Sequence, residues 1–355
     1  VVLITKFSVS SPRPSPAMLC ILYVTAVGTL LGVVCLLIER VLPPAAARRW
    51  IWCAAIPISI AIPGFYRAQH TWAITGATAQ QAAELPLGPA LRTASLTALD
   101  SRLWAHIETW DPIISQLWLL ASGVLIIWGL ANAMRVSEVV GESRRQRRDS
   151  KAPEIVDGVP VLVTNKIGPA TVGVWHSRVL IPQWVLALPG TQRQYVVRHE
   201  EEHRRAHDAR LLFLASLPII LMPWNLALWW QLRRLCLAVE TDCDNRVVSA
   251  LGDANAYGAL LFKVAEASSH GPRLQPAFIG GMGTLERRLT ALLEPTPLKH
   301  IQRVLLPAAA IALLFVVLSM PHPVLEHGKH AHVAMTAGAH ATTPTAPDGA
   351  INQQR

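Results

Sequence analysis

A group of ionisable residues near the middle of the chain has the spacing of a catalytic metal site. The stretch reads His199-Glu200-Glu201-Glu202-His203. Histidines at i and i+4 lie on one face of a helix, so both imidazoles can bind the same zinc ion. The glutamate after the first histidine would then lie beside a water molecule at the metal and could take its proton. The alternative interpretation is a solvated charged helix with two incidental histidines.

A catalytic zinc site needs a third protein ligand and keeps one position for water. The candidate ligand is Glu240, in the stretch AVETDCDNRVV. Glu240 and Asp244 lie at i and i+4 of an expected helix, so Glu240 could bind zinc while Asp244 accepts a hydrogen bond from a ligand histidine. Cys243 is soft enough to be a ligand, but we expect it to point away from the Glu240 face. A solvated acidic face is the alternative interpretation of this pair.

Two further residues follow the motif directly. His207 lies eight residues after His199 and is expected on a similar helical face. A ligand role stays open for His207, but a supporting or packing role is favoured. Asp208 is expected to orient a neighbouring side chain or to cap the helix end.

The elements that would carry these residues are a few strands followed by helices. Residues 159–164, 171–175 and 178–182 are rich in β-branched and apolar side chains and predict β-strands. Charged helix formers fill residues 192–209. Further helices are predicted at 226–250, 254–268 and 284–293.

The composition places this site in a membrane protein. The chain has 355 residues, of which 52% are hydrophobic and only 15% are charged, whereas soluble proteins carry about 25% charged residues. A membrane-spanning helix needs about 20 mostly apolar residues. Four runs are predicted to span the membrane: 18–38, 50–66, 113–134 and 304–320.

A fifth apolar run, 211–232, is predicted to dip into the membrane rather than cross it. A single crossing would leave His203 and Glu240 about 30 Å apart, on opposite sides of the membrane. Pro218, Pro223 and Asn225 lie within the run and are expected to break a straight helix.

The distribution of charge predicts the orientation. Lys and Arg exceed Asp and Glu by 32 − 23 = 9 over the whole chain. Residues 135–303 hold 22 basic and 16 acidic residues, while the connection 67–112 holds three arginines and four acids. By the positive-inside rule, 135–303 should be cytoplasmic and 67–112, the N-terminus and the C-terminus outside. Topology therefore explains the positive charge, and no direct nucleic-acid partner is expected.

The two ends of the chain are expected to be irregular. Residues 1–17 predict an unstructured arm, and Met18 is expected to be the translation start. Residues 321–355 are rich in Ala, Thr, Pro and His and predict a disordered tail. The five cysteines show no zinc-finger spacing and predict no disulfide framework.

The motifs, taken in order, resemble those of the BlaR/MecR-type membrane metallopeptidases, the antirepressor zinc proteases of bacterial β-lactam sensing and their relatives. The resemblance covers about residues 18–320. It rests on GPATVGVWHSRVLIP (168–182), HEEEHRRAHD (199–208), ETDCD (240–244) and LERRL (285–289).

The resemblance implies four transmembrane helices and a cytoplasmic α+β, gluzincin-like zinc peptidase domain over 135–303. It assigns one zinc ion to His199, His203 and Glu240, and the role of catalytic base to Glu200. It also implies a substrate bound as an added strand near 171–181. The expected partners are the lipid bilayer and a protein substrate. That substrate is a cytoplasmic transcriptional repressor, the chain itself or both, and a homodimer is left open.

One departure from the β-lactam sensors concerns signal reception. Those sensors carry a large penicillin-binding domain after the last span, whereas 35 residues follow Met320 here, too few for such a domain. We therefore do not expect direct β-lactam binding. A signal would arrive through 67–112, the tail or another protein. The resemblance places this chain in the bacterial inner membrane.

Three other classes of protein compete with this interpretation. A membrane sensor or scaffold with a vestigial zinc site would have no use for the base Glu200. A housekeeping membrane metalloprotease would share the zinc motif but not the ETDCD and GPATVGVW segments. A transporter is disfavoured because no ionisable residue lies within the three clearest spans.

Overall fold

The computed structural model describes residues 16–42, 48–76, 111–145, 154–164, 167–268, 282–293 and 299–320. Residues 1–15 of the expected arm, 77–110 of the expected outer loop and the expected tail 321–355 lie outside the described residues. Within them, the chain is mainly helical, with one small sheet of four strands.

Three of the described helices are long and apolar enough to cross a membrane. They are α1 (Pro16–Val41), α4 (Asp111–Arg145) and α11 (His300–Ser319). Three of the four predicted spans are thus confirmed as candidate membrane helices. The helix α4 continues through Arg145, beyond the end predicted at residue 134.

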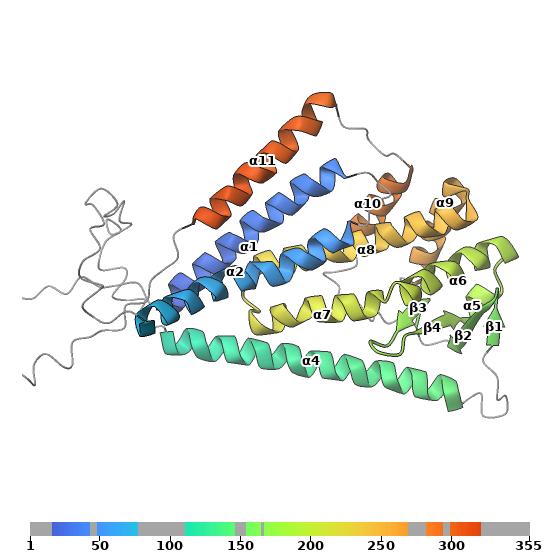
Figure 1. Ribbon diagram of the computed structural model, residues 1–355. Coiled ribbons are helices and arrows are strands. Elements are labelled where there is room, and N and C mark those ends of the chain that lie inside the picture. The colour runs from blue at the N-terminus through green and yellow to red at the C-terminus, as the bar shows by residue number, and fades with distance from the viewer. Residues whose placement is uncertain are drawn as a thin grey trace, which may run out of the picture. The chain divides into compact units, whose positions relative to one another are not determined.

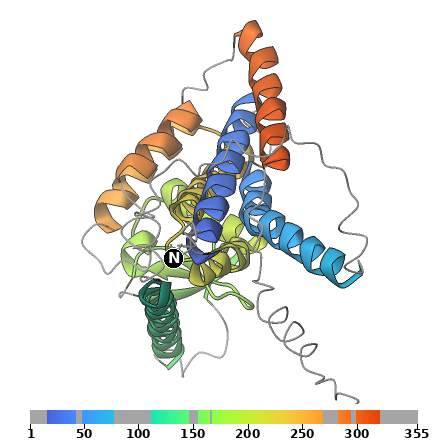
Figure 2. The ribbon, with the colours of Figure 1, turned by 90° about the vertical axis from the view of Figure 1, so that its left-hand side faces the viewer.

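The predicted span 50–66 belongs to a longer helix, α2 (Arg49–Gly76). Its described apolar stretch, Arg49–Ile62, is shorter than a membrane span. α2 and α11 both pack against α1 (Figure 1, Figure 2).

The strands form a mixed sheet in the order β1-β2-β4-β3. β2 and β4 pair in parallel, and each outer strand pairs antiparallel with its neighbour. The predicted strand 171–175 ends early because Gly173 adopts φ +100°, where a Cβ atom would lie 2.7 Å from the His176 carbonyl oxygen. The strands are β1 (Glu154–Val156), which was not predicted, β2 (Val159–Thr164), β3 (Ala170–Val172) and β4 (Arg178–Pro182).

Helices pack on this sheet to make a core beside the motif. Val161 and Ile181 of the sheet cluster with Val197, Val247 and Tyr257, all almost fully buried. These helices follow the sheet in the chain (Figure 1): α5 (Gln183–Leu186), α6 (Gly190–Arg205), α8 (Leu226–Leu251), α9 (Ala254–Ser268) and α10 (Met282–Leu293).

The run 211–232 folds into a helical hairpin, which confirms the predicted break. Helix α7 (Asp208–Leu221) packs beside α8, and a turn at 222–225 joins them. Pro218 lies inside α7 rather than at the break. The buried side chain of Asn225 starts α8 by accepting hydrogen bonds from the amides of Ala227 and Leu228. The hairpin returns the chain, so that α8 packs against α6.

Candidate metal centre

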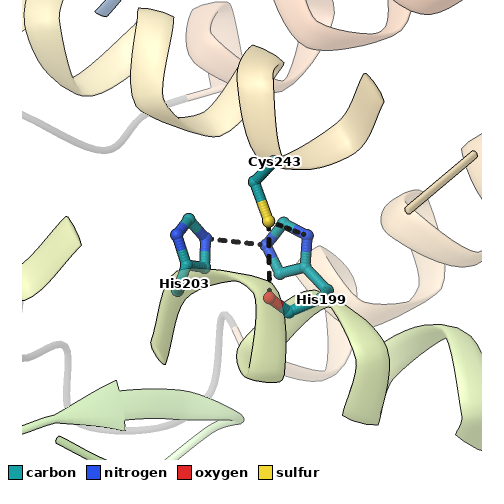
Figure 3. A group of neighbouring side chains, drawn as sticks. All are labelled: His199, His203 and Cys243. Atoms are coloured by element: carbon teal, nitrogen blue, oxygen red, sulfur yellow. Dashed lines mark hydrogen bonds between the residues drawn. The ribbon is translucent and has the colours of Figure 1, made fainter. Parts of the chain in front are cut away.

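The two histidines of the motif meet on one face of α6. Their Nε2 atoms are 3.2 Å apart, and their rings stand edge to face with centroids 4.7 Å apart (Figure 3). Helix α6 runs unbroken from Gly190 to Arg205, which gives the i and i+4 residues this common direction. The structure therefore brings His199 and His203 together as the spacing predicts.

Glu240, from α8, faces the same two nitrogen atoms. Its Oε2 is 3.7 Å from Nε2 of His199, and its Oε1 is 3.8 Å from Nε2 of His203. Ligand atoms bonded to zinc at about 2.0–2.2 Å in a tetrahedron are roughly 3.3–3.6 Å from one another. The three side chains are thus spaced close to what one zinc ion requires.

Cys243 also lies at the site, so the prediction that it points away from Glu240 is wrong. The physical reason is that residues three apart on a helix lie on neighbouring parts of one face. The Cys243 sulfur is buried, 3.3 Å from Nδ1 of His199, and forms a cluster with both histidines that could hold a metal ion (Figure 3). Geometry alone thus offers two candidates for the third ligand, Glu240 and Cys243.

The outer nitrogen of each imidazole is held by a partner. Nδ1 of His203 is 2.8 Å from Oδ2 of Asp208, and Nδ1 of His199 is 2.9 Å from the Tyr257 hydroxyl. That hydroxyl donates to Oδ1 of Asp244 at 2.7 Å. Such contacts fix the ring orientation and leave Nε2 for a metal. Asp208 therefore orients a neighbour as predicted. Asp244 lies 3.6 Å from Nδ1 of His199 and also contacts it through the Tyr257 hydroxyl.

Arg288 of α10 joins Glu240 and Asp244, two of the three acidic residues of α8. Its Nη1 is 2.9 Å from Oε2 of Glu240, and its Nη2 and Nε donate to the two Asp244 oxygens at 2.7 and 2.8 Å. Bidentate arginine–carboxylate contacts fix both position and angle. Arg288 lies in the LERRL segment, whose role the sequence did not reveal. No sequence signal pointed to Tyr257.

Glu200 is buried and tied to the edge of the sheet. The Thr171 hydroxyl lies 3.1 Å from Oε2 of Glu200 and 2.6 Å from its backbone oxygen. Thr171 belongs to β3, the outermost strand. The contact therefore places the predicted base beside a strand that can still pair on its open side.

The neighbouring acidic residues of the motif face other partners. Glu201 binds Arg204 and Arg205, and Glu202 binds Arg198 and Arg246. These pairs lie on the other sides of α6, so Glu201 and Glu202 do not enter the metal centre.

His207 lies outside the centre, and the prediction of a shared helical face is wrong. Helix α6 ends at Arg205, and His207 adopts a left-handed backbone conformation, φ 55°, in the turn before α7. Its side chain is exposed. The i+8 relation to His199 fails because the helix does not continue that far.

The charges around His199, Glu240 and Cys243 favour a positive charge between α6 and α8. Burial alone would lower the pKa of His199, but Cys243 and Glu240 raise it to about 10. Burial would raise the pKa of Glu240, yet Arg288 and the two histidines hold it well below its usual range. The pKa of Cys243 is likewise lowered by the histidines in spite of burial. A divalent cation would supply the positive charge that these groups stabilise.

A comparison with known protein families decides the relationship. The model of BlaR1 peptidase M56 matches residues 17–292, more than three quarters of the chain. The chain belongs to the BlaR1 peptidase M56 family. No curated protein matches the chain significantly.

The matched region contains the whole centre, from the first membrane helix to Arg288. M56 membership makes a metallopeptidase the expected activity. The donors around His199 and His203 fit that expectation, since two imidazoles with free Nε2 atoms and an anionic third group form a zinc-type ligand set.

Proposed function

We propose that this protein is a membrane-embedded zinc endopeptidase in which His199, His203 and Glu240 hold the metal and Glu200 is the base. The observation that supports it most is the geometry of the three ligands. Two Nε2 atoms lie 3.2 Å apart and face a carboxylate, while Asp208 and Tyr257 engage the two Nδ1 atoms.

When bound, zinc would polarise the scissile carbonyl and the attacking water. The buried Glu200 would take the water proton and pass it to the leaving amine. Thr171 holds one oxygen of Glu200 and so limits its rotation. A vestigial or structural metal site needs no such base, which favours the enzyme over a scaffold.

The open edge of β3 supports a peptide as the substrate. A substrate strand that pairs with Ala170–Val172 would pass beside Glu200, because Thr171 contacts that side chain from the same strand. Backbone pairing binds extended peptides with little demand on their sequence. Specificity would then come from the side chains of the substrate on either side of the cut.

The location of the site supports a role in signalling across the bacterial inner membrane. We propose that 135–303 is cytoplasmic, that the hairpin of α7 and α8 dips into the membrane, and that α1, α2, α4 and α11 are the four spans. The excess of basic residues in 135–303 supports this orientation. The substrate would be a cytoplasmic repressor-type protein or the chain itself, cut after a signal from outside.

The substitution Glu200→Gln tests the chemistry. It should leave the zinc content unchanged and lower cleavage by about 10²–10⁴-fold, the usual contribution of a general base. Self-cleavage in purified membranes and the proteins that accumulate uncut in cells are the readouts. The matched control is Glu201→Gln, whose carboxylate binds Arg204 and Arg205 away from the centre. Normal cleavage by the Glu200→Gln protein would refute the mechanism.

A further inference from the structure

The carboxylate that orients His203 is also bound from a membrane helix. Asp208 is the first residue of α7 and is almost fully buried. Its Oδ2 contacts Nδ1 of His203 at 2.8 Å, and its Oδ1 accepts a hydrogen bond from Nη1 of Arg49 at 2.8 Å. One carboxylate therefore links Arg49 to a residue of the metal centre 154 positions later in the chain.

Arg49 is the first residue of α2, the helix whose apolar stretch runs from Arg49 to Ile62. Helix α2 packs against both α7 and α8. Trp52 and Ile56, one and two turns after Arg49, are fully buried against Leu228 and Leu235 of α8. This packing holds the start of α2 at the base of the hairpin, so that the Arg49 side chain reaches Asp208.

The contact between Asp208 and Arg49 is buried and has few alternatives. The Arg49 side chain is 13% exposed and the Asp208 side chain 3%, so water competes little for this hydrogen bond. Among the described residues, Arg246 also lies near Asp208, on the other oxygen: its Nη2 is 3.7 Å from Oδ2, while its Nε donates to Glu202 at 3.1 Å. Loss of Arg49 would leave Oδ1 buried without its charged donor. The Asp208 carboxylate would then no longer be held in the orientation that faces His203.

Resting on the zinc site proposed above, we propose that Arg49 is a positioning residue that holds His203 through Asp208. The first residue of the membrane helix α2 thereby sets the affinity of the centre for zinc. Because α2 is continuous from Arg49 to Gly76, a shift or tilt of this helix would move the Arg49 side chain relative to Asp208. Zinc binding would respond to that movement.

The test is zinc affinity in the full-length protein in detergent, measured by competition with a chelator. Arg49→Gln and Arg49→Met both remove the guanidinium, and each should weaken zinc binding by about 10–100-fold, the usual effect of losing an outer partner of a ligand histidine. The matched control is Arg48→Gln, one residue away, whose side chain donates to the Leu42 carbonyl rather than to Asp208. That control should keep the affinity of the wild type.

A double-mutant cycle tests whether Arg49 acts on zinc binding through Asp208. Asp208→Asn should also weaken zinc binding, and adding Arg49→Gln to it should cause little further loss, because both changes break one link. If the ion pair only fastens α2 to α7, the Arg49 variants would unfold at a lower temperature without zinc but bind zinc normally. Normal zinc affinity in whichever Arg49 variant folds, or losses that multiply in the double variant, would overturn the proposal.

The same titration separates this proposal from the function on which it rests. If the wild type binds no zinc, the proposed peptidase centre and the role of Arg49 both fail. If the wild type binds one zinc and the Arg49 variants bind it equally well, the positioning role alone fails.

Discussion

At the scale of single residues, the candidate centre consists of the proposed ligands and of the side chains that orient them. His199 is held by Tyr257, His203 by Asp208 and Glu240 by Arg288, each through a contact of 2.8–2.9 Å. Three different helices supply those partners: α9, α7 and α10. The ligand geometry thus depends on the assembled domain and not on α6 alone.

The third ligand can be decided by substitution. If Glu240 binds zinc, Glu240→Gln should lower zinc affinity by more than the about 10–100-fold typical of an outer partner. Cys243→Ser should change it little, because the Cys243 sulfur contacts His199 at Nδ1, which lies 2.9 Å from the Tyr257 hydroxyl. The Co²⁺-loaded wild type should lack a thiolate-to-metal charge-transfer band, and a strong band that disappears in Cys243→Ser would assign the ligand to Cys243.

What the sequence could predict at this scale follows from local spacing. His199, Glu200 and His203 share one helix, so their relation is fixed by helical geometry. The contacts of Tyr257 with His199 and of Arg49 with Asp208 join residues 58 and 159 positions apart, and no local pattern encodes such pairs. Cys243 lies three residues after Glu240 on α8, and residues three apart on a helix are neighbours, so its spacing from Glu240 places it at the centre.

At the scale of elements, the hairpin of α7 and α8 connects the centre to α1 and α2. The buried side chain of Gln231 in α8 donates to the backbone oxygen of Gly28 in α1 and to the Ser59 hydroxyl in α2. Trp230 of α8 packs against Trp52 of α2 with ring centroids 5.8 Å apart. These contacts hold three helices together where apolar packing alone would not fix their register.

Gly32 of α1 lies directly against Trp230 of α8. Its substitution measures how much this contact contributes to stability. A Cβ atom at Gly32 would overlap the indole of Trp230, so Gly32→Ala should destabilise the protein by about 1–3 kcal/mol. Thermal unfolding in detergent measures this. The control is Gly123→Ala in α4, where a Cβ would meet no atom within 4 Å. Equal stability of the two variants would contradict tight packing of α1 on α8.

The elements were largely predictable, and the exceptions have physical causes. The strands at 159–164 and 178–182 and the helix at 254–268 were predicted with their observed bounds. β1 was missed because three residues give no alternating pattern. The break of the run 211–232 was predicted at Pro218, Pro223 and Asn225. It falls at the turn 222–225, which contains Pro223 and Asn225, whereas Pro218 is accommodated inside α7.

At the scale of the whole molecule, the charge and the apolar residues of the sequence separate into different parts. The candidate spans Cys20–Val41, Pro112–Ser143 and His300–Ser319 are long apolar helices. The ion pairs of Arg49, Glu201, Glu202 and Arg288 surround the metal centre. The predicted total of four spans includes α2, whose described apolar stretch, Arg49–Ile62, is shorter than the three candidate spans, so the fourth span stays a prediction.

The most direct test of the account is removal and return of the metal in the purified full-length protein. The account predicts one zinc per chain, loss of proteolysis when a chelator removes it, and recovery when one equivalent of Zn²⁺ is added back. His203→Ala should retain no zinc and no proteolysis under the same conditions. Proteolysis that persists in the zinc-free wild type, or a purified protein that binds no zinc at all, would contradict the account.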